Sequence, residues 1–249
     1  MPALRMLFHY LPILLLAAAW EAGARLGMVN PAAMPPLSAI AAAWWELLVS
    51  GDLVHHGLSS LANLTAGLSL AAVVGITLGV LMARIPLIED IVSPLIKCLY
   101  PLPKSALIPV LIMWFGLGTG SKVAAIFIGS LLPLVTSAYN GARGVDRVLV
   151  WSARAAGAGR WRVIADVVLP GALPDILVGF RNALALSFIL LVSSEFLIGQ
   201  RGLGYLISFL GEGGIYTGMY AGVLTVSAVG FLCDRFYLLV MGRVLAWRA

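Results

Sequence analysis

The feature that most constrains this chain is a series of long apolar segments without charged residues. A helix that crosses a bilayer needs about 20 mostly apolar residues, because the hydrocarbon core is roughly 30 Å thick. Residues 53–83, 123–142 and 213–233 contain no Asp, Glu, Lys or Arg over such lengths. In lipid, every backbone polar group must be satisfied within the protein, and a helix does so within its own segment. The chain is therefore expected to be an all-α integral membrane protein.

The overall composition supports this fold class. Only 11% of the 249 residues are charged and 61% are apolar, whereas soluble domains carry about 25% charged residues. So few charges cannot cover the surface of a soluble protein of this size, which excludes an ordinary soluble enzyme or a disordered chain. The two cysteines, Cys98 and Cys233, both lie in apolar stretches and indicate buried thiols rather than a disulfide framework or a metal pair.

The apolar segments predict a bundle of six membrane-spanning helices. Their working boundaries are residues 6–26, 60–83, 91–117, 123–141, 176–199 and 215–240. We expect residues 1–59 to hold the first helix and an external segment, with a short interfacial helix near residues 41–49. Residues 60–249 are expected to form the core domain.

The first predicted helix has an alternative interpretation as a cleaved signal peptide. Arg5 precedes a short apolar run that contains Ala17-Ala18-Ala19, a pattern typical of such a peptide. The remaining chain is itself embedded in the membrane, so an uncleaved helix is the simpler account.

The placement of arginines predicts the orientation of the bundle. Alternating spans put both termini, residues 84–90 and residues 142–175 on one side. Nine arginines fall there: Arg5, Arg84, Arg143, Arg147, Arg154, Arg160, Arg162, Arg243 and Arg248. The other side holds Arg25, Lys122 and Arg201. Because cytoplasmic loops carry the excess of Lys and Arg, both termini and the long segment are expected to be cytoplasmic.

Small residues recur every four positions along the second predicted span. They are Gly67, Ala71, Gly75, Gly79 and Ala83. Such a face lets two helix backbones approach closely, which is how helices associate in lipid. The ladder predicts packing within the bundle and carries no information about a substrate.

Prolines interrupt the third predicted span, which is expected to be kinked or broken. They are Pro94, Pro101, Pro103 and Pro109. Lys104 lies in this stretch and Glu195 lies deep in the fifth span, where charged side chains are costly and are often functional. Both are candidate residues of a translocation pathway. The alternatives are a snorkelling lysine, a structural ion pair, or a pair formed between Lys104 and Glu195.

Residues 142–175 form the longest cytoplasmic segment and carry the strongest functional signal. Residues 147–156 and 161–169 fit two short helices separated by Gly157 and Gly159, and Pro170 is expected to end the second one. Pro174 suits the first turn of the fifth span. This thin, small-residue surface could dock into a groove on another protein, and Arg154, Arg160 and Arg162 could pair with acids there. The alternative is a solvated, positively charged loop.

The chain resembles the permease subunits of binding-protein-dependent ABC importers. Gly157, nine intervening residues, Val167, one residue and Leu169-Pro170 match the G-x9-I-x-LP part of the EAA loop of that family. PLPKSALIPVLIMWFGLGTGSK (101–122), ADVVLPGALPDILVGFRNAL (165–184) and GLGYLI (202–207) are similar to its nitrate, sulfonate and taurine branch. Trp151-Ser152-Ala153 stands where the family usually has Glu-Ala-Ala.

The resemblance implies a type I importer permease fold, also called MetI-like, and a non-catalytic transport subunit of the bacterial inner membrane. It also implies a homodimer, two ATPase subunits that bind ATP and Mg²⁺, and a soluble substrate-binding protein, with no cofactor or metal in this chain and no nucleic acid as a partner. The substrate would be a small anion such as nitrate, a sulfonate or taurine, although the branch also includes pathways for thiamine-precursor and riboflavin-like molecules. Within the coupling loop, residues 142–171, it assigns contact with the ATPase to Trp151, Ser152, Ala153, Arg154, Ala156, Gly157, Ala158, Leu169 and Pro170.

Two other classes of protein are alternatives to an importer permease. A stand-alone secondary transporter would favour an internal repeat with paired broken helices, and no such repeat is visible. An intramembrane enzyme would need a motif such as HExxH or GxSxG, and the sequence contains neither. The sequence also lacks a G-x4-GK[ST] phosphate loop, so any ATPase must be a separate chain.

Overall fold

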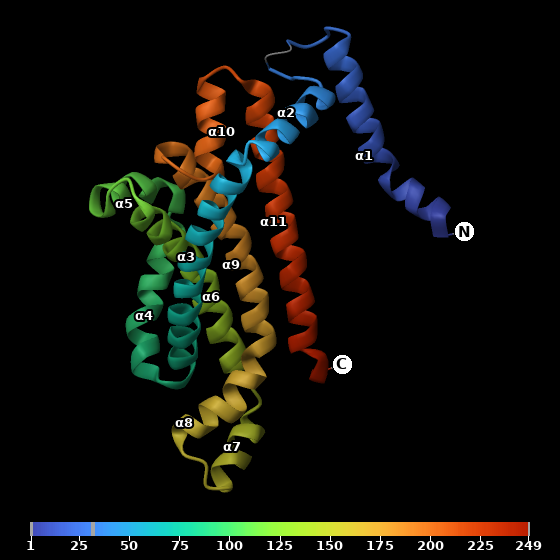
Figure 1. Ribbon diagram of the computed structural model, residues 1–249. Coiled ribbons are helices and arrows are strands. Elements are labelled where there is room, and N and C mark those ends of the chain that lie inside the picture. Colours follow the sequence, from blue (N-terminus) through green and yellow to red (C-terminus); the bar gives the residue numbers. More distant parts are fainter. Residues whose placement is uncertain (1, 31–32, 249) are drawn as a thin grey trace.

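Helices make up nearly all of this protein in the computed structural model (Figure 1). The structure describes the backbone of residues 2–30 and 33–248, and the side chains of residues 11–30, 33–197 and 199–247. Within these residues there is no β-strand. The elements in chain order are α1 (Pro2–Arg25), α2 (Leu37–Val49), α3 (Asp52–Arg84), α4 (Pro86–Leu99), η1 (Lys104–Leu107), α5 (Ile108–Phe115), α6 (Thr119–Gly144), α7 (Arg147–Ala155), α8 (Arg160–Val163), the π-turn η2 (Ile164–Val168), α9 (Leu169–Ile198), α10 (Leu203–Glu212), α11 (Tyr216–Val244) and η3 (Ala246–Arg248).

Three long helices form the centre of the bundle, where α6 packs along both α3 and α9. The small-residue ladder of α3 faces α6: a Cβ added at Gly67 would lie 2.7 Å from Ile126 Cβ, and one added at Gly75 would lie 2.8 Å from Leu134 Cβ. Distances this short leave no room for a side chain. The predicted role of the ladder in close helix packing is therefore confirmed.

The described residues contain four helical runs long and apolar enough to cross a membrane. They are α3, α6, α11 and the run from Arg160 to Leu197. The second, fourth, fifth and sixth predicted spans are thus found, with shifted ends. The first coincides with α1, whose initial side chains lie outside the described residues, so its crossing, the total of six spans and the position of the N-terminus stay predictions.

The third predicted span is broken, as its prolines indicated. Helix α4 and the η1–α5 segment meet at an angle of 93°, so residues 91–117 form a bent pair rather than one straight helix. Pro101 and Pro103 lie in the break between Leu99 and Lys104. Each proline lacks the N–H that a continuing helix would use at that point.

The end of the cytoplasmic segment differs from the prediction. Its second helix does not stop at Pro170, because α8 continues through η2 directly into α9. Pro170 lies in the first turn of α9, immediately after a π-turn whose wider backbone accommodates a residue without an N–H. Pro174 consequently lies inside α9, not in its first turn as predicted.

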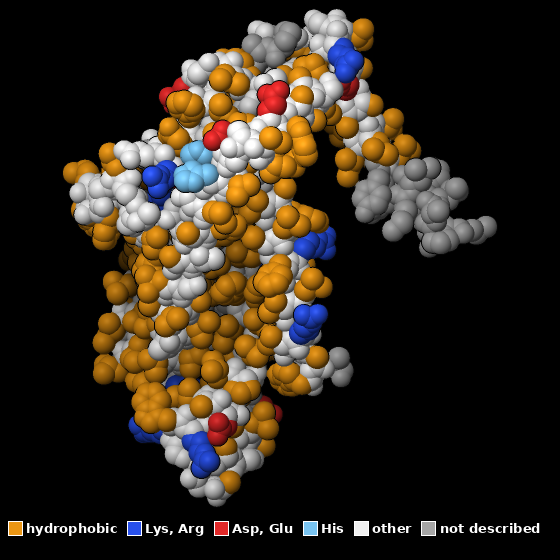
Figure 2. Space-filling view, in the orientation of Figure 1, with side chains coloured by type: hydrophobic (Ala, Val, Ile, Leu, Met, Phe, Trp, Pro, Cys, Tyr) orange, Lys and Arg blue, Asp and Glu red, His pale blue; other side chains and the backbone are white. Residues whose placement is uncertain are grey.

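The two ends of the bundle carry different short elements. Figure 1 shows α7 and α8 beyond one end of the central helices, and α2 and α10 at the opposite end. Helix α11 descends alongside the bundle and ends on the α7–α8 side, while α1 extends away from the rest. Hydrophobic side chains cover the middle of the molecule and basic side chains gather around α7 and α8 (Figure 2).

Candidate functional site

Helix α7 of the coupling loop is capped at both ends by its own residues. The Asp146 carboxylate accepts a hydrogen bond from Val148 N at 2.8 Å, which satisfies one of the free N–H groups of the first turn. At the other end, Ala158 N donates to the Ala153 carbonyl at 3.0 Å and Gly157 N donates to the Arg154 carbonyl at 2.9 Å. This pair of bonds is a Schellman motif. Gly157 has φ +86°, a left-handed conformation that favours glycine.

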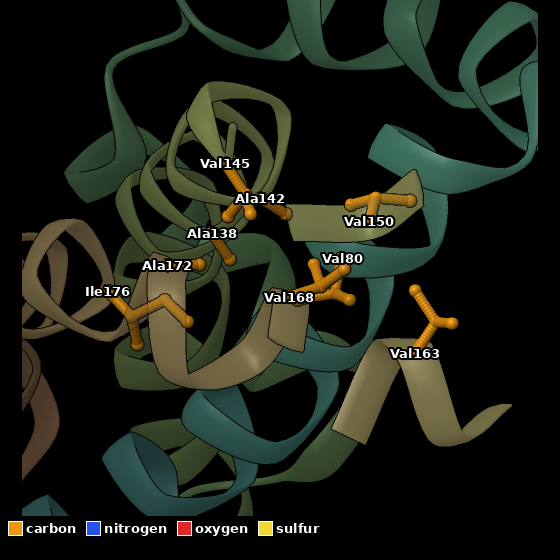
Figure 3. Close-up of a cluster of buried hydrophobic side chains, with 9 residues drawn as sticks. All are labelled: Val80, Ala138, Ala142, Val145, Val150, Val163, Val168, Ala172 and Ile176. Carbon is orange, nitrogen blue, oxygen red and sulfur yellow. The ribbon is translucent and has the colours of Figure 1, made fainter. Parts of the chain in front are cut away.

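A hydrophobic cluster fixes the coupling loop to one end of the bundle (Figure 3). We call this end, where α7 and α8 lie, the inner end. Val150 of α7, Val163 of α8 and Val168 of η2 are all buried. They belong to one cluster with Val145, which follows the end of α6, and with side chains of α3, α6 and α9, namely Val80, Ala138, Ala142, Ala172 and Ile176. The loop is therefore packed against the spanning helices and is not a freely solvated connection.

The predicted contact residues occupy the other face of the loop. Trp151 is 62% exposed, and Ser152, Arg154, Ala156, Gly157, Leu169 and Pro170 are exposed as well. Ala153 and Ala158 are half-buried and pack partly against the hydrophobic cluster. Ala153, Ala156, Gly157 and Ala158 line a shallow depression of about 290 Å³ together with Arg162, Asp166 and Val167.

Lys104 lies at the bend between α4 and α5. Its Nζ donates to the Tyr100 carbonyl and lies 5.4 Å from the centre of the Tyr100 ring. The side chain lines an apolar pocket of about 280 Å³ between the bent pair and α6, with Leu102, Leu107 and Trp114 among its other walls. The lysine is therefore held by its own segment.

Glu195 lies near the end of the bundle that is remote from the coupling loop (Figure 1), and it is 0% exposed. Its Oε2 accepts hydrogen bonds from Ser60 Oγ at 2.7 Å and from Gly204 N at 3.1 Å. The structure thus gives Glu195 partners on α3 and at the start of α10, and the pair with Lys104 considered from the sequence is not formed.

Three side chains besides Glu195 itself bind the backbone of the segment that follows it. Ser60 Oγ accepts from Leu203 N at 2.8 Å, His56 Nδ1 accepts from Gly202 N at 3.1 Å, and Lys122 Nζ donates to the Arg201 carbonyl at 2.8 Å. Gly202 has φ +118°, and a side chain there would collide with the Glu195 carboxylate. The sequence analysis did not predict this site, and we call its backbone segment, residues 199–204, the outer turn. An acid within an apolar span, followed closely by Gly-Leu-Gly, was the sequence pattern that could have indicated it.

A family model described as "Binding-protein-dependent transport system inner membrane component" matches residues 75–245. The chain belongs to this family and is a multi-pass permease subunit of an ABC importer. The resemblance drawn from the coupling loop and the GLGYLI segment is therefore confirmed.

Two relatives cover most of the chain. The taurine transport system permease protein TauC of Escherichia coli (strain K12) is 30% identical over 237 residues, which is 93% of this chain and 86% of TauC. The putative aliphatic sulfonates transport permease protein SsuC of Bacillus subtilis (strain 168) is 32% identical over 238 residues, or 96% of this chain and 86% of SsuC. A third relative, the riboflavin transport system permease protein RibX of Chloroflexus aurantiacus, is 33% identical over 79% of this chain and 73% of RibX.

Solved structures share the fold. A chain of the MetNI methionine ABC transporter in an inward-facing conformation superposes with a TM-score of 0.68 at 19% identity, covering 79% of this chain and 97% of that one. An amino acid ABC transporter crystallised with histidines gives 0.62 at 16% identity, covering 79% and 94%. The fold is thus that of a type I importer permease.

Proposed function

We propose that two copies of this chain form the translocation pathway of a bacterial inner-membrane importer driven by two separate ATPase subunits. In this proposal the ATPases bind ATP and Mg²⁺, a soluble binding protein delivers the substrate outside, and this chain catalyses no reaction. ATP binding closes the ATPase pair, the coupling loops move with it, and the bundle opens outward.

The observation that carries this proposal is the construction of the coupling loop. Helix α7 is capped at both ends, and its buried face joins a cluster shared by α3, α6 and α9. A rigid element packed against three spanning helices can transmit a displacement applied to its exposed face, as coupling between two distant sites requires. A solvated loop with few buried contacts would absorb the displacement.

The proposed substrate is a small organic sulfonate, taurine included. The support is the transport named for TauC and SsuC, which align over more than nine tenths of this chain. Riboflavin, the cargo named for RibX, is the second candidate. The proposed pathway residues are Lys104, which lines a pocket at the bend of α4 and α5, and Glu195.

The test is reconstitution of the chain in proteoliposomes with the ATPase that co-purifies with it and with the binding protein. We expect taurine or ethanesulfonate uptake that requires ATP and stops when residues 147–169 are replaced by a flexible linker of equal length. Ion-driven uptake by this chain without an ATPase would instead identify a secondary transporter. Riboflavin uptake in place of sulfonate uptake would reject the proposed substrate and leave the mechanism standing.

A further inference from the structure

We propose that a cleft between the coupling loop and the inner end of α3 receives acidic side chains of the ATPase subunit, and that Arg84, Arg154 and Arg160 bind them. This inference rests on the proposed function, because it specifies the chemistry of the partner surface at the same loop.

The cleft has a volume of about 330 Å³ and lies where α3, α7 and α8 meet. Arg84 is the last residue of α3, Arg154 lies in the last turn of α7, and Arg160 is the first residue of α8. Trp161, Val150 and Val163 are among its other walls, and no acidic side chain of the described residues lines it. Three positive charges from three elements therefore face one space.

Among the described residues, the arginines of this cleft have no acidic partner, unlike Arg143 and Arg162 nearby. Arg143 is paired with Glu89 at 2.7 Å, and Arg162 lies 3.6 Å from Asp166. The ion pairs of the described residues include none with Arg84, Arg154 or Arg160.

Arg84 gives the clearest sign of a missing partner. Its Nη2 donates to the Ala142 carbonyl at 2.8 Å, but its Nε is buried and has no acceptor in the described residues. A buried donor without an acceptor destabilises the fold. A carboxylate placed in the cleft would offset the repulsion between the guanidinium groups that line it.

The charge of the whole loop indicates the source of that carboxylate. Asp146 and Asp166 are the acids of residues 142–171; one caps α7 and the other lies beside Arg162. The loop also presents the exposed indole of Trp151. The loop therefore offers positive charge and aromatic surface, and its binding partner should offer acids.

The choice of a protein partner over a small anion follows from the walls of the cleft. Trp161 is 71% exposed and adds a large apolar surface to the wall of the cleft. An ATPase surface that holds the loop would cover the indole and supply carboxylates together, whereas a free anion would supply charge alone. Because Arg84 terminates α3, such a contact would also link the ATPase directly to a spanning helix.

The experiment compares two variants of the full chain in nanodiscs, made either of phosphatidylcholine alone or with added phosphatidylglycerol. One variant is Arg154→Glu with Arg160→Glu. The matched control is Arg147→Glu, an exposed charge reversal at the start of α7 outside the cleft. The probe is the ATPase subunit recovered with the wild-type chain, and its affinity is measured at several NaCl concentrations. Thermal melting checks that both variants are folded.

We expect the double variant to bind the ATPase at least about tenfold more weakly and with less dependence on salt, while the control stays within about twofold. An acid-to-lysine change on the ATPase, selected for restored uptake, should rescue the double variant. Equal losses in the two variants would overturn the proposal. So would unchanged ATPase affinity accompanied by lost dependence on phosphatidylglycerol, which would assign the cleft to lipid headgroups. If the wild-type chain recovers no ATPase at all, the proposed function itself fails.

Discussion

The two ends of the bundle use their polar residues in opposite ways. At the outer turn, residues 199–204, His56, Ser60, Lys122 and Glu195 all bind backbone groups of the same chain. At the inner end, Arg84, Arg154 and Arg160 line a cleft that no acidic side chain of the described residues lines. The outer turn is held by hydrogen bonds within one chain, although Glu195 Oε1 is buried without a partner among the described residues, whereas the arginines of the inner end have no carboxylate of the described residues beside them.

The difference separates polar groups that are removed from water from charges that stay at the surface. A polar group removed from water must be paired, whatever its location. The outer turn meets most of this requirement through contacts between α3, α6, α9 and α10. Arg154 and Arg160 at the inner end are exposed, so water or another molecule can supply their acceptors. Substitutions at the two ends should therefore differ: those outside should damage the fold, and those inside should damage transport.

The largest expected effect is at the outer turn, for Glu195→Leu. The substitution leaves Gly204 N and the Ser60 hydroxyl without their acceptor in a buried site, which should lower the free energy of unfolding by about 2–4 kcal/mol. Glu195→Gln retains an acceptor oxygen and should lose much less. The measurement is thermal melting of the purified chain in nanodiscs.

The control for Glu195 is Glu46→Gln, which changes an exposed carboxylate of α2. It should melt as the wild-type chain does. If Glu195→Leu melts at the wild-type temperature, the outer turn is not held by this side chain, and the contrast between the ends disappears.

The next effect is expected at the cluster that joins the loop to the bundle, for Val168→Ala. Val168 is 0% exposed, and removing two buried carbon atoms should cost about 1–2 kcal/mol, including the cavity left behind. Val178→Ala, on the exposed face of α9, is the matched control. If the cluster transmits motion, Val168→Ala should also raise the ATP hydrolysed per solute imported in proteoliposomes. An unchanged ratio would restrict the cluster to a role in stability.

Much of the bundle was predictable from the sequence because its signals are local. Long segments without charged residues predicted α3, α6 and α11. The glycine ladder predicted a close-packing face on α3, which proves to meet α6. Pro101 and Pro103 predicted the break before α5. The continuation through Pro170 was not predictable, because a π-turn depends on how Val163 and Val168 pack against other helices. The residues of the coupling loop were predicted through a sequence motif. The partners of Glu195 and the cleft at Arg84 were not predictable in this way, because they bring together segments that lie far apart in the chain. Arg84 in particular was interpreted only as an orientation signal.

A change in stability no larger than that of Val168→Ala is expected for Gly157→Val. Gly157 has φ +86°, and a left-handed conformation costs an L-residue about 1–2 kcal/mol. A Cβ there would meet nothing within 4 Å in this chain, so the strain is conformational. The Schellman motif should loosen, and ATP hydrolysis should continue with little uptake. Gly157→Asn should retain more coupling, because asparagine tolerates this conformation. Coupled transport at the wild-type level in Gly157→Val would contradict docking through this turn.

The smallest structural effect, and the most specific functional one, is expected for Lys104→Met. Lys104 is hydrogen-bonded within its own segment, to the Tyr100 carbonyl, so its loss should leave assembly with the ATPase and the melting temperature unchanged. Its ammonium group nevertheless stands at the edge of an apolar pocket beside the bend, where one positive charge can attract an anionic solute. The uptake rate of ethanesulfonate should fall, and Lys97→Met, which removes an exposed lysine of α4, should serve as the matched control. If both variants import at the wild-type rate, Lys104 acts only at the bend, and the pathway runs elsewhere along the bundle.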